Sequence, residues 1–210
     1  MLGVIIAVKD EAAAILANAA YRWEAGGLYY SASKQIILSI CGIGKANAAF
    51  ALGRIFDRAD EILMFGTAGA LGAAKIGELY LCTEFVEHDI TPFSGLPSAV
   101  ISAPNSQIQE KVRKICRAEN LELKEGRILS GNQVICSQEL AKEKTEQFGG
   151  QLADMESAAA AKICQRLGKP FCAVRYITDN ADSSAEINWR QNVKTSADIF
   201  DRILLKLVEQ

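Results

Sequence analysis

The chain has only one histidine, His88, among its 210 residues. A zinc site built from several imidazole ligands is therefore disfavoured, and a serine–histidine–aspartate triad would have to pass through this single side chain. We expect His88 instead to be a structural histidine whose hydrogen bonds are satisfied inside the fold.

Long apolar runs are also missing. No run approaches the roughly 18 residues that a membrane-spanning helix requires, so we expect no membrane partner. The apolar segment 1–8 follows no basic region and is ended by Lys9-Asp10-Glu11, unlike a signal peptide. None of the six cysteines forms a CxxC pair, and disulfide frameworks are typical of smaller, secreted chains. We therefore expect six buried thiols in the reducing cytoplasm.

Neither sign of charge is in marked excess. The 23 basic and 25 acidic side chains give a net charge of −2, which provides no general attraction to nucleic acid or anionic lipid. Half of the residues are hydrophobic and 23% are charged, as in ordinary globular proteins. A chain of this length buries roughly 70% of the surface that it exposes when unfolded, and we expect residues 1–210 to form a single domain.

Short β-branched runs alternate with longer stretches of helical periodicity. We expect strands at 2–8, 29–30, 35–41, 61–65, 77–86, 127–129 and 170–177. We expect helices at 11–20, 42–56, 105–119, 138–147, 156–167 and 189–208. Most of the strands are apolar throughout, as strands covered on both faces are. The pattern therefore predicts an α/β protein with a mixed sheet and helices on both of its faces.

Polar residues stand at the ends of several predicted strands, where α/β sheets bind ligands. Glu11 follows the first strand, Asp154-Met155-Glu156 precedes the helix at 156–167, and Asp179 follows the last core strand. Two glycine turns, Gly42-Ile43-Gly44 and Gly66-Thr67-Ala68-Gly69, let the backbone approach a ligand closely. Each carboxylate alone could be a helix-terminal acid or a cap. Three of them at one rim indicate a binding site.

The familiar nucleotide-binding fingerprints are absent. No GxGxxG follows the first strand, and no GxxxxGK[ST] occurs anywhere. Neither a dinucleotide site nor a Walker loop is therefore predicted. A phosphate, a ribose or a base at the glycine turns stays open on these grounds, as do ordinary tight turns.

Five segments occur in the order found in a known family. They are Gly42-Ile43-Gly44-Lys45, 66–71 with 75–79 after it, Ser130-Gly131-Asn132, 154–158 and 175–182. Over nearly the whole chain they resemble the purine/uridine phosphorylase superfamily, and within it the methylthioadenosine/S-adenosylhomocysteine nucleosidases. The resemblance implies a three-layer α/β/α sandwich around a central mixed, partly barrel-like β-sheet, and a homodimer. It also implies hydrolysis of the N-glycosidic bond of adenine nucleosides such as 5′-methylthioadenosine and S-adenosylhomocysteine, without metal or organic cofactor.

The resemblance also implies roles for single residues. Asp179 matches the general acid that protonates or hydrogen-bonds N7 of the departing adenine, and Glu11 matches the acid that positions and deprotonates the attacking water. Glu156 matches the carboxylate that holds the ribose hydroxyls, with Met155 flanking the sugar. Thr67 stands near the active-site acid, where the family often has serine.

Further correspondences concern the base and the 5′ substituent. Ile135 would pair with the adenine edge through its backbone, whereas Val134 stands where the family usually has an aromatic residue that stacks on the base. The 5′ pocket is expected to be apolar, with Ile90 and Phe93 contributed by the partner subunit of a homodimer. On this chain's own side that pocket is expected to contain Val8, Ile43, Met155 and Trp189.

The chemistry explains these residue types without the family. Cleaving a ribosidic bond develops positive charge on the sugar and negative charge on the base. A neutral acid is then needed at the base, so Asp179 requires a raised pKa. A carboxylate beneath the sugar, Glu156, favours the cationic transition state. Glu11 would activate water on the side opposite the leaving base, as in the two-carboxylate mechanism of inverting glycosidases.

Alternatives remain at this point. Phosphorylases of this superfamily bind phosphate with arginines, one of them just before the glycine segment at 66–69, but here 63–65 is Leu-Met-Phe and favours a hydrolase. A futalosine-type hydrolase, a purine nucleoside phosphorylase with an unusual phosphate site, and a non-catalytic nucleoside-binding protein that kept the fold stay open. The pathway stays open too, among methionine salvage, methyl-cycle clean-up and menaquinone synthesis.

Overall fold

The computed structural model describes residues 1–90, 100–102 and 106–209. Within them the chain forms ten β-strands, six α-helices and one 3₁₀ turn, η1 (Ala19–Tyr21). The strands are β1 (Leu2–Ile6), β2 (Glu24–Ala25), β3 (Tyr29–Ser31), β4 (Ile36–Ile40), β5 (Glu61–Ala70), β6 (Leu79–Glu87), β7 (Val100–Ser102), β8 (Leu123–Ser130), β9 (Leu152–Asp154) and β10 (Phe171–Asp179). The helices are α1 (Ala13–Ala17), α2 (Lys45–Ile55), α3 (Gln107–Ala118), α4 (Gln138–Phe148), α5 (Ser157–Arg166) and α6 (Ala185–Val208).

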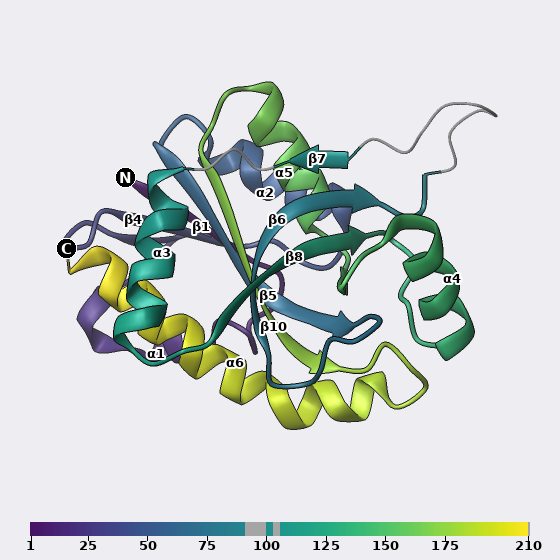
Figure 1. Ribbon diagram of the computed structural model, residues 1–210. Helices are drawn as coiled ribbons and strands as arrows, with labels where there is room; N and C mark the ends of the chain where they lie inside the picture. Colours follow the sequence, from purple (N-terminus) through teal and green to yellow (C-terminus); the bar gives the residue numbers. More distant parts are fainter. Residues whose placement is uncertain (91–99, 103–105, 210) are drawn as a thin grey trace.

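All of these strands belong to one mixed sheet, visible at the centre of Figure 1. Its order is β10-β6-β8-β9-β5-β1-β4-β3-β2, with β7 added to β6. β10 also pairs with β5 in parallel, from Phe171 opposite Ile62 to Asp179 opposite Gly69. This second pairing closes β10, β6, β8, β9 and β5 into a ring. The predicted mixed, partly barrel-like sheet is therefore confirmed.

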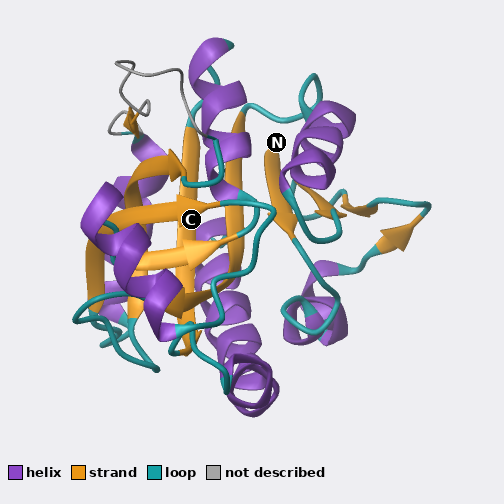
Figure 2. Cartoon of the chain, turned by 90° about the vertical axis from the view of Figure 1, so that its right-hand side faces the viewer, coloured by secondary structure: helices purple, strands orange, loops and turns teal. Residues whose placement is uncertain are grey.

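Helices cover the sheet on both faces, as Figure 2 shows. On one face, α2 and α5 bury small residues such as Ala51 and Ala161 against the strands, which lets the two helices lie close to the sheet. On the other face, α1, α3 and α6 bury larger side chains. There the ring of Phe200 in α6 stacks on Phe65 of β5 at 4.9 Å between centroids. The predicted three-layer α/β/α arrangement is confirmed.

The glycine segment at 66–69 differs from the prediction, because β5 continues to Ala70 instead of turning after residue 65. A Cβ at Gly66 would lie 3.1 Å from Nη1 of Arg175, and a Cβ at Gly69 would lie 2.9 Å from Oδ1 of Asp179. Glycine is needed at these two positions for close packing against neighbouring side chains rather than for a turn.

Several other helices and strands are shorter or longer than the sequence predicts. The helix predicted at 11–20 is shorter, since α1 covers only Ala13–Ala17 and a 3₁₀ turn follows it. The last helix starts at Ala185, four residues before the predicted start at Trp189. β8 is longer than the predicted strand at 127–129. The short strands β2, β7 and β9 were not predicted, because two or three residues carry no periodic signal.

Two expectations about buried side chains need correction. All six cysteines are free, but Cys136 is exposed and Cys41 half-buried, so the expectation of six buried thiols is wrong for these two loop residues. His88 is 3% exposed, and burial lowers the pKa of its imidazole. Neither ring nitrogen has a hydrogen-bond partner among the described residues, so the expected satisfied histidine is not found there.

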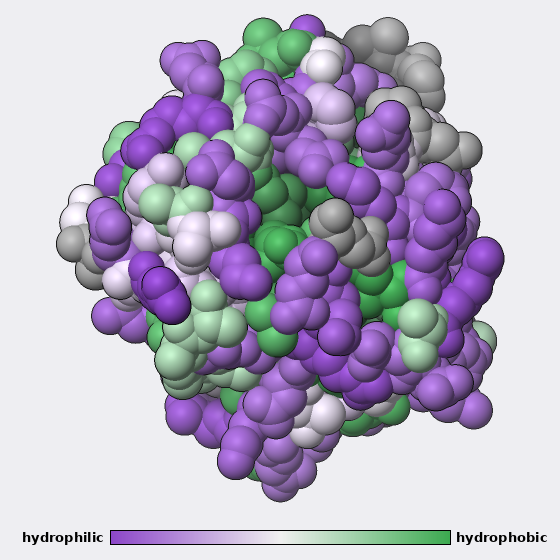
Figure 3. Space-filling model, turned by 90° about the vertical axis from the view of Figure 1, so that its left-hand side faces the viewer, coloured by the Kyte–Doolittle hydropathy of each residue, from purple (hydrophilic) through white to green (hydrophobic). Residues whose placement is uncertain are grey.

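The outer surface is consistent with the charge balance of the sequence. Figure 3 shows one face as predominantly hydrophilic, with hydrophobic side chains gathered in a hollow near its centre. Among the helices that the structure describes, none combines the length and the hydropathy needed to span a bilayer.

Candidate active site

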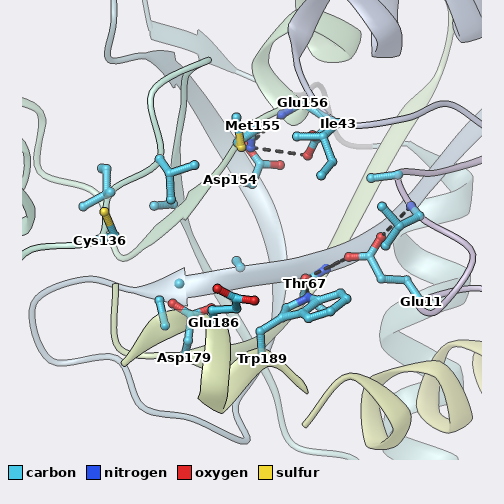
Figure 4. A pocket seen from close by; sticks show the side chains of 18 residues that line it. Glu11, Ile43, Thr67, Cys136, Asp154, Met155, Glu156, Asp179, Glu186 and Trp189 are labelled. Carbon is cyan, nitrogen blue, oxygen red and sulfur yellow. Dashed lines mark hydrogen bonds between the residues drawn. The ribbon is translucent and has the colours of Figure 1, made fainter. Parts of the chain in front are cut away.

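A cavity of about 510 Å³ opens at the carboxyl ends of β1, β5 and β10. In Figure 4 the three predicted carboxylates, Glu11, Glu156 and Asp179, come from different sides of this cavity. The segments that carry them are far apart along the chain. The parallel pairing of β1 and β10 with β5 brings Glu11 and Asp179 together, and the antiparallel pairing of β9 with β5 brings Glu156 to the same place. Ten of the predicted site residues line the cavity, namely Val8, Glu11, Ile43, Thr67, Val134, Ile135, Met155, Glu156, Asp179 and Trp189.

Two predicted residues are not among the lining. Ile90 is 46% exposed and lies outside the cavity of its own chain. Phe93 lies outside the described residues. Both were expected to reach the site of a partner subunit, so their place relative to this chain's own cavity does not decide their role.

Glu11 lies in the turn after β1 and is only 3% exposed. Its Oε1 accepts hydrogen bonds from the backbone N–H of Thr67 at 2.7 Å and from the Thr67 hydroxyl at 2.8 Å. Its Oε2 accepts only a longer bond, 3.2 Å, from the backbone N–H of Val8. Burial raises the pKa of this carboxyl, while the Thr67 bonds and the positive charge of Arg175 oppose the rise. Oε2 therefore keeps the capacity to accept a further proton or hydrogen bond.

Glu156 stands immediately before α5, and its Oε1 accepts a 2.7 Å hydrogen bond from the backbone N–H of Gly44. Gly44 has φ of +103°, a conformation that glycine adopts without strain. Burial raises the pKa of Glu156 to about 7, the negative charge of Asp154 adds to the rise, and the Gly44 bond and Arg175 oppose it. The loop after β4 thus holds a carboxylate whose ionisation changes near neutral pH.

Asp179 ends β10, where the pairing with β5 is irregular. Its Oδ1 accepts from the backbone N–H of Ala181 at 2.9 Å, and its Oδ2 accepts from the Thr178 hydroxyl at 3.0 Å. Burial is the main cause that raises the pKa of Asp179 above its ordinary value. A carboxyl group that resists ionisation is suited to donating a proton.

A buried ion pair lies near two of the carboxylates, Glu11 and Glu156, and the sequence predicts no role for it. Nε and Nη2 of Arg175 donate to Oδ2 of Asp154 at 3.1 and 3.0 Å, and Nη2 also donates to the Ser157 hydroxyl at 2.7 Å. The one signal for it was an arginine within the otherwise apolar strand 171–177. Its charge lowers the pKa of both Glu11 and Glu156.

Two lining residues with an acidic or a nucleophilic side chain are not predicted from the sequence. Glu186 lies in the first turn of α6, before residue 189, where the sequence predicts this helix to start. Cys136 lies beside Ile135 and is exposed. Neither side chain carries a motif of its own.

The cavity lining has a distinctive charge. Its described residues include five carboxylates, Glu11, Asp154, Glu156, Asp179 and Glu186. None of the described lining residues is lysine, arginine or histidine. Within the described residues, no cluster of three histidine, cysteine, aspartate or glutamate side chains is arranged to hold a metal ion. The lining therefore favours a neutral or cationic ligand over a phosphate.

The chain matches a known family over nearly its whole length. The family model described as "Phosphorylase superfamily" matches residues 2–209. The chain is 29% identical over 194 residues to the aminodeoxyfutalosine nucleosidase of Helicobacter pylori, covering 88% of this chain and 84% of that protein. It is also 29% identical over 178 residues to the 5′-methylthioadenosine/S-adenosylhomocysteine nucleosidase of Thermotoga maritima, covering 84% and 80%.

A solved structure shows the same fold with a bound analogue. The 5′-methylthioadenosine/S-adenosylhomocysteine nucleosidase of Helicobacter pylori with butyl-thio-DADMe-Immucillin-A superposes with a TM-score of 0.88 at 27% identity, covering 99% of this chain and 97% of that one. Because the family match extends over almost every residue, the chain belongs to the phosphorylase superfamily.

Proposed function

We propose that the protein hydrolyses the N-glycosidic bond of adenine nucleosides such as 5′-methylthioadenosine and S-adenosylhomocysteine, releasing adenine. The observation that supports this most strongly is the meeting of Glu11, Glu156 and Asp179 around one cavity. Relatives named for this activity cover most of the chain. The reaction needs an acid at the base, a carboxylate at the sugar and a base for water, and the three side chains supply one each.

The steps follow from the protonation states. Asp179, protonated, donates its proton to N7 of the base while the bond between C1′ and N9 breaks and its electron pair leaves with the base. Glu156 accepts hydrogen bonds from the ribose hydroxyls and faces the cationic sugar. A water molecule attacks C1′ and passes one proton to Oε2 of Glu11, which balances the proton that Asp179 gave up.

Water is the nucleophile rather than phosphate. Phosphate recognition in proteins relies on arginine, lysine or backbone N–H groups that face the anion. The described lining of this cavity has no cationic side chain and several carboxylates, which would repel phosphate. A purine nucleoside phosphorylase is therefore the less suitable description of this site.

A related hydrolase is the second candidate. Aminodeoxyfutalosine nucleosidases are as similar in sequence as the methylthioadenosine enzymes. At the wall where an aromatic residue was expected to stack on the base, this chain presents Val134, which is 53% exposed. The base is then held mainly by Asp179 and by the backbone at Ile135, and selection among nucleosides shifts to the 5′ substituent.

The assembly, place and pathway of the enzyme are part of the proposal. A homodimer would bury Ile90, which is 46% exposed in the single chain, and would bring it with Phe93 to the partner's 5′ pocket. Six free thiols favour the reducing cytoplasm. The proposed substrates fit methionine salvage. Sedimentation of the purified protein tests the dimer, and a monomer at micromolar concentration would refute it.

A substrate panel tests the reaction. The protein is incubated with 5′-methylthioadenosine, S-adenosylhomocysteine, adenosine, inosine and aminodeoxyfutalosine, with and without phosphate, and the free base is measured. We expect adenine from the first two, at a rate that phosphate does not change. Asp179→Asn and Glu11→Gln should each lower turnover about 10²- to 10⁴-fold. Binding of adenine nucleosides without release of base would show instead a non-catalytic nucleoside-binding protein.

A further inference from the structure

The wall of the cavity contains a polar chain of three side chains from three elements. Nε1 of Trp189 in α6 lies 3.0 Å from Oγ1 of Thr67 in β5, and Oγ1 lies 2.8 Å from Oε1 of Glu11 after β1. Figure 4 shows the indole of Trp189 beside Thr67, with the Glu11 carboxylate beyond it. The resemblance gave Trp189 only an apolar role, covering the 5′ substituent.

The hydrogens available on each group fix the direction of both hydrogen bonds, the one between Trp189 and Thr67 and the one between Thr67 and Glu11. The indole N–H can only donate, and the threonine hydroxyl has one hydrogen and accepts through its lone pairs. Oγ1 of Thr67 must therefore accept from Trp189. Its own hydrogen is directed to Glu11, whose ionised carboxylate can only accept. A phenylalanine in place of Trp189 would leave the hydroxyl free to turn elsewhere.

The same bonds divide the two oxygens of Glu11 into different tasks. Oε1 receives two short bonds, both from Thr67, and Oε2 receives one long bond from the backbone of Val8. The oxygen with two short bonds anchors the carboxylate, and the other keeps a lone pair free to accept a further hydrogen bond. We propose that Trp189 is a positioning residue that, by donating to the Thr67 hydroxyl, locks Glu11 with Oε2 toward the attacking water.

The hydrogen bonds from Trp189 to Thr67 and from Thr67 to Glu11 also affect the pKa of Glu11. Glu11 accepts hydrogen bonds from Thr67 in β5 and from Val8 in the turn after β1. The titratable groups near enough to interact with its charge are Arg175 in β10, Glu156 before α5 and the Cys41 thiol after β4. The hydrogen bond from the Thr67 hydroxyl lowers the pKa of Glu11 against the rise caused by burial. When Trp189 no longer orients that hydroxyl, the pKa of Glu11 rises, and more of the enzyme carries an inactive, protonated base.

The test variant, Trp189→Phe, removes the indole N–H and keeps an aromatic ring in the wall of the cavity. This inference rests on the proposed function, so base release by the wild-type protein is measured first. In Trp189→Phe we expect kcat for 5′-methylthioadenosine to fall about 2- to 13-fold, the effect of losing one hydrogen bond between two neutral groups. KM should change less than about twofold, and the acid limb of the pH profile should move to higher pH.

Three further variants separate this role from a structural one. Trp23→Phe removes the other tryptophan, whose Nε1 donates to the Ile15 carbonyl at 2.9 Å, and should leave kcat unchanged. Thr67→Ser keeps the hydroxyl and should retain most of kcat. In a Thr67→Val background the bond to Glu11 is already lost, so adding Trp189→Phe should have no further effect.

The outcomes are distinct. No base release from any nucleoside by wild-type protein would defeat the proposed function itself. Base release with an unchanged kcat and pH profile in Trp189→Phe would overturn the inference alone. So would an equal loss from Trp189→Phe in the Thr67→Val background, because the indole would then act on the substrate and not through Thr67.

Discussion

The guanidinium of Arg175 lies 3.0 Å from Oδ2 of Asp154, and both side chains are 1% exposed. The two residues are 21 positions apart, in β10 and at the end of β9. Their charges are therefore compensated almost entirely by each other and by hydroxyl and carbonyl partners such as Ser157. The positive charge of Arg175 also lowers the pKa of the nearby carboxyls of Glu11 and Glu156.

Asp154→Asn tests how much the buried ion pair with Arg175 contributes to the free energy of unfolding. The substitution leaves the Arg175 charge buried without its counterion, and breaking a buried pair from one side costs about 3–5 kcal/mol. We expect urea unfolding to give a free energy of unfolding lower by about that amount. The matched control is Glu186→Gln, which breaks the exposed pair with Arg190 at 2.8 Å and should cost no more than about 0.5 kcal/mol. Equal effects of the two substitutions would contradict the assignment.

Much of this fold could be predicted from local patterns. The runs at 2–8, 35–41 and 170–177 read as buried strands because they are apolar throughout, and β1, β4 and β10 lie within or near those ranges. The three carboxylates were predicted because they follow such strands or occur in a motif in register. These are signals that a few neighbouring residues carry.

The remaining features depend on contacts between distant segments. Whether β10 pairs with β5 as well as β6, and so closes the barrel, is decided by the whole sheet. Contacts between distant segments also explain why β5 extends through Gly66 and Gly69. The sequence of this segment is typical of a turn, and the glycines are explained only by the close packing of Arg175 and Asp179 against them. The bond from Trp189 to Thr67 joins residues 122 positions apart, and no local pattern announces it.

Glu156 predicts how stability depends on pH. Its pKa is about 7 in the folded protein against 4.5 ordinarily, so the folded state binds more protons between those values. Unfolding then becomes easier as the pH rises, because the stability present below pH 4.5 is lost on passing through about 7. Glu156→Gln cannot ionise, and its stability relative to wild type should increase by about 2–3 kcal/mol between pH 4.5 and pH 8.

Urea unfolding at those two pH values measures the difference. The amide oxygen of the Gln side chain can still accept from Gly44, so the loop after β4 should stay in place. Glu139→Gln, on an exposed residue of α4, is the control and should track wild type at both values. A Glu156→Gln variant that also tracks wild type would mean that Glu156 ionises in the folded protein as it does in the unfolded chain.

Gly69→Ala probes the packing that holds the proposed acid. The new methyl group would lie 2.9 Å from Oδ1 of Asp179 and 3.1 Å from Cβ of Ala181, so the carboxyl must shift. A displacement on this scale at a reacting group lowers turnover on the order of 10²-fold. Gly53→Ala in α2, where a Cβ meets nothing within 4 Å, should keep full activity and gain roughly 0.5–1 kcal/mol of stability. Steady-state rates and thermal unfolding of both variants decide the matter, and a fully active Gly69→Ala would refute the constraint.

Val134→Phe predicts a gain of affinity. Val134 lines the cavity with half of its surface exposed, at the position where the family resemblance expects an aromatic residue against the base. Stacking of aromatic rings contributes about 0.5–1.5 kcal/mol beyond the burial of area. KM for 5′-methylthioadenosine should therefore fall about 2- to 10-fold, with kcat unchanged, because substrate and transition state gain alike. Val134→Leu enlarges the apolar wall without a ring, so an equal fall of KM in that variant would trace the gain to apolar contact alone and remove stacking from the account of base binding.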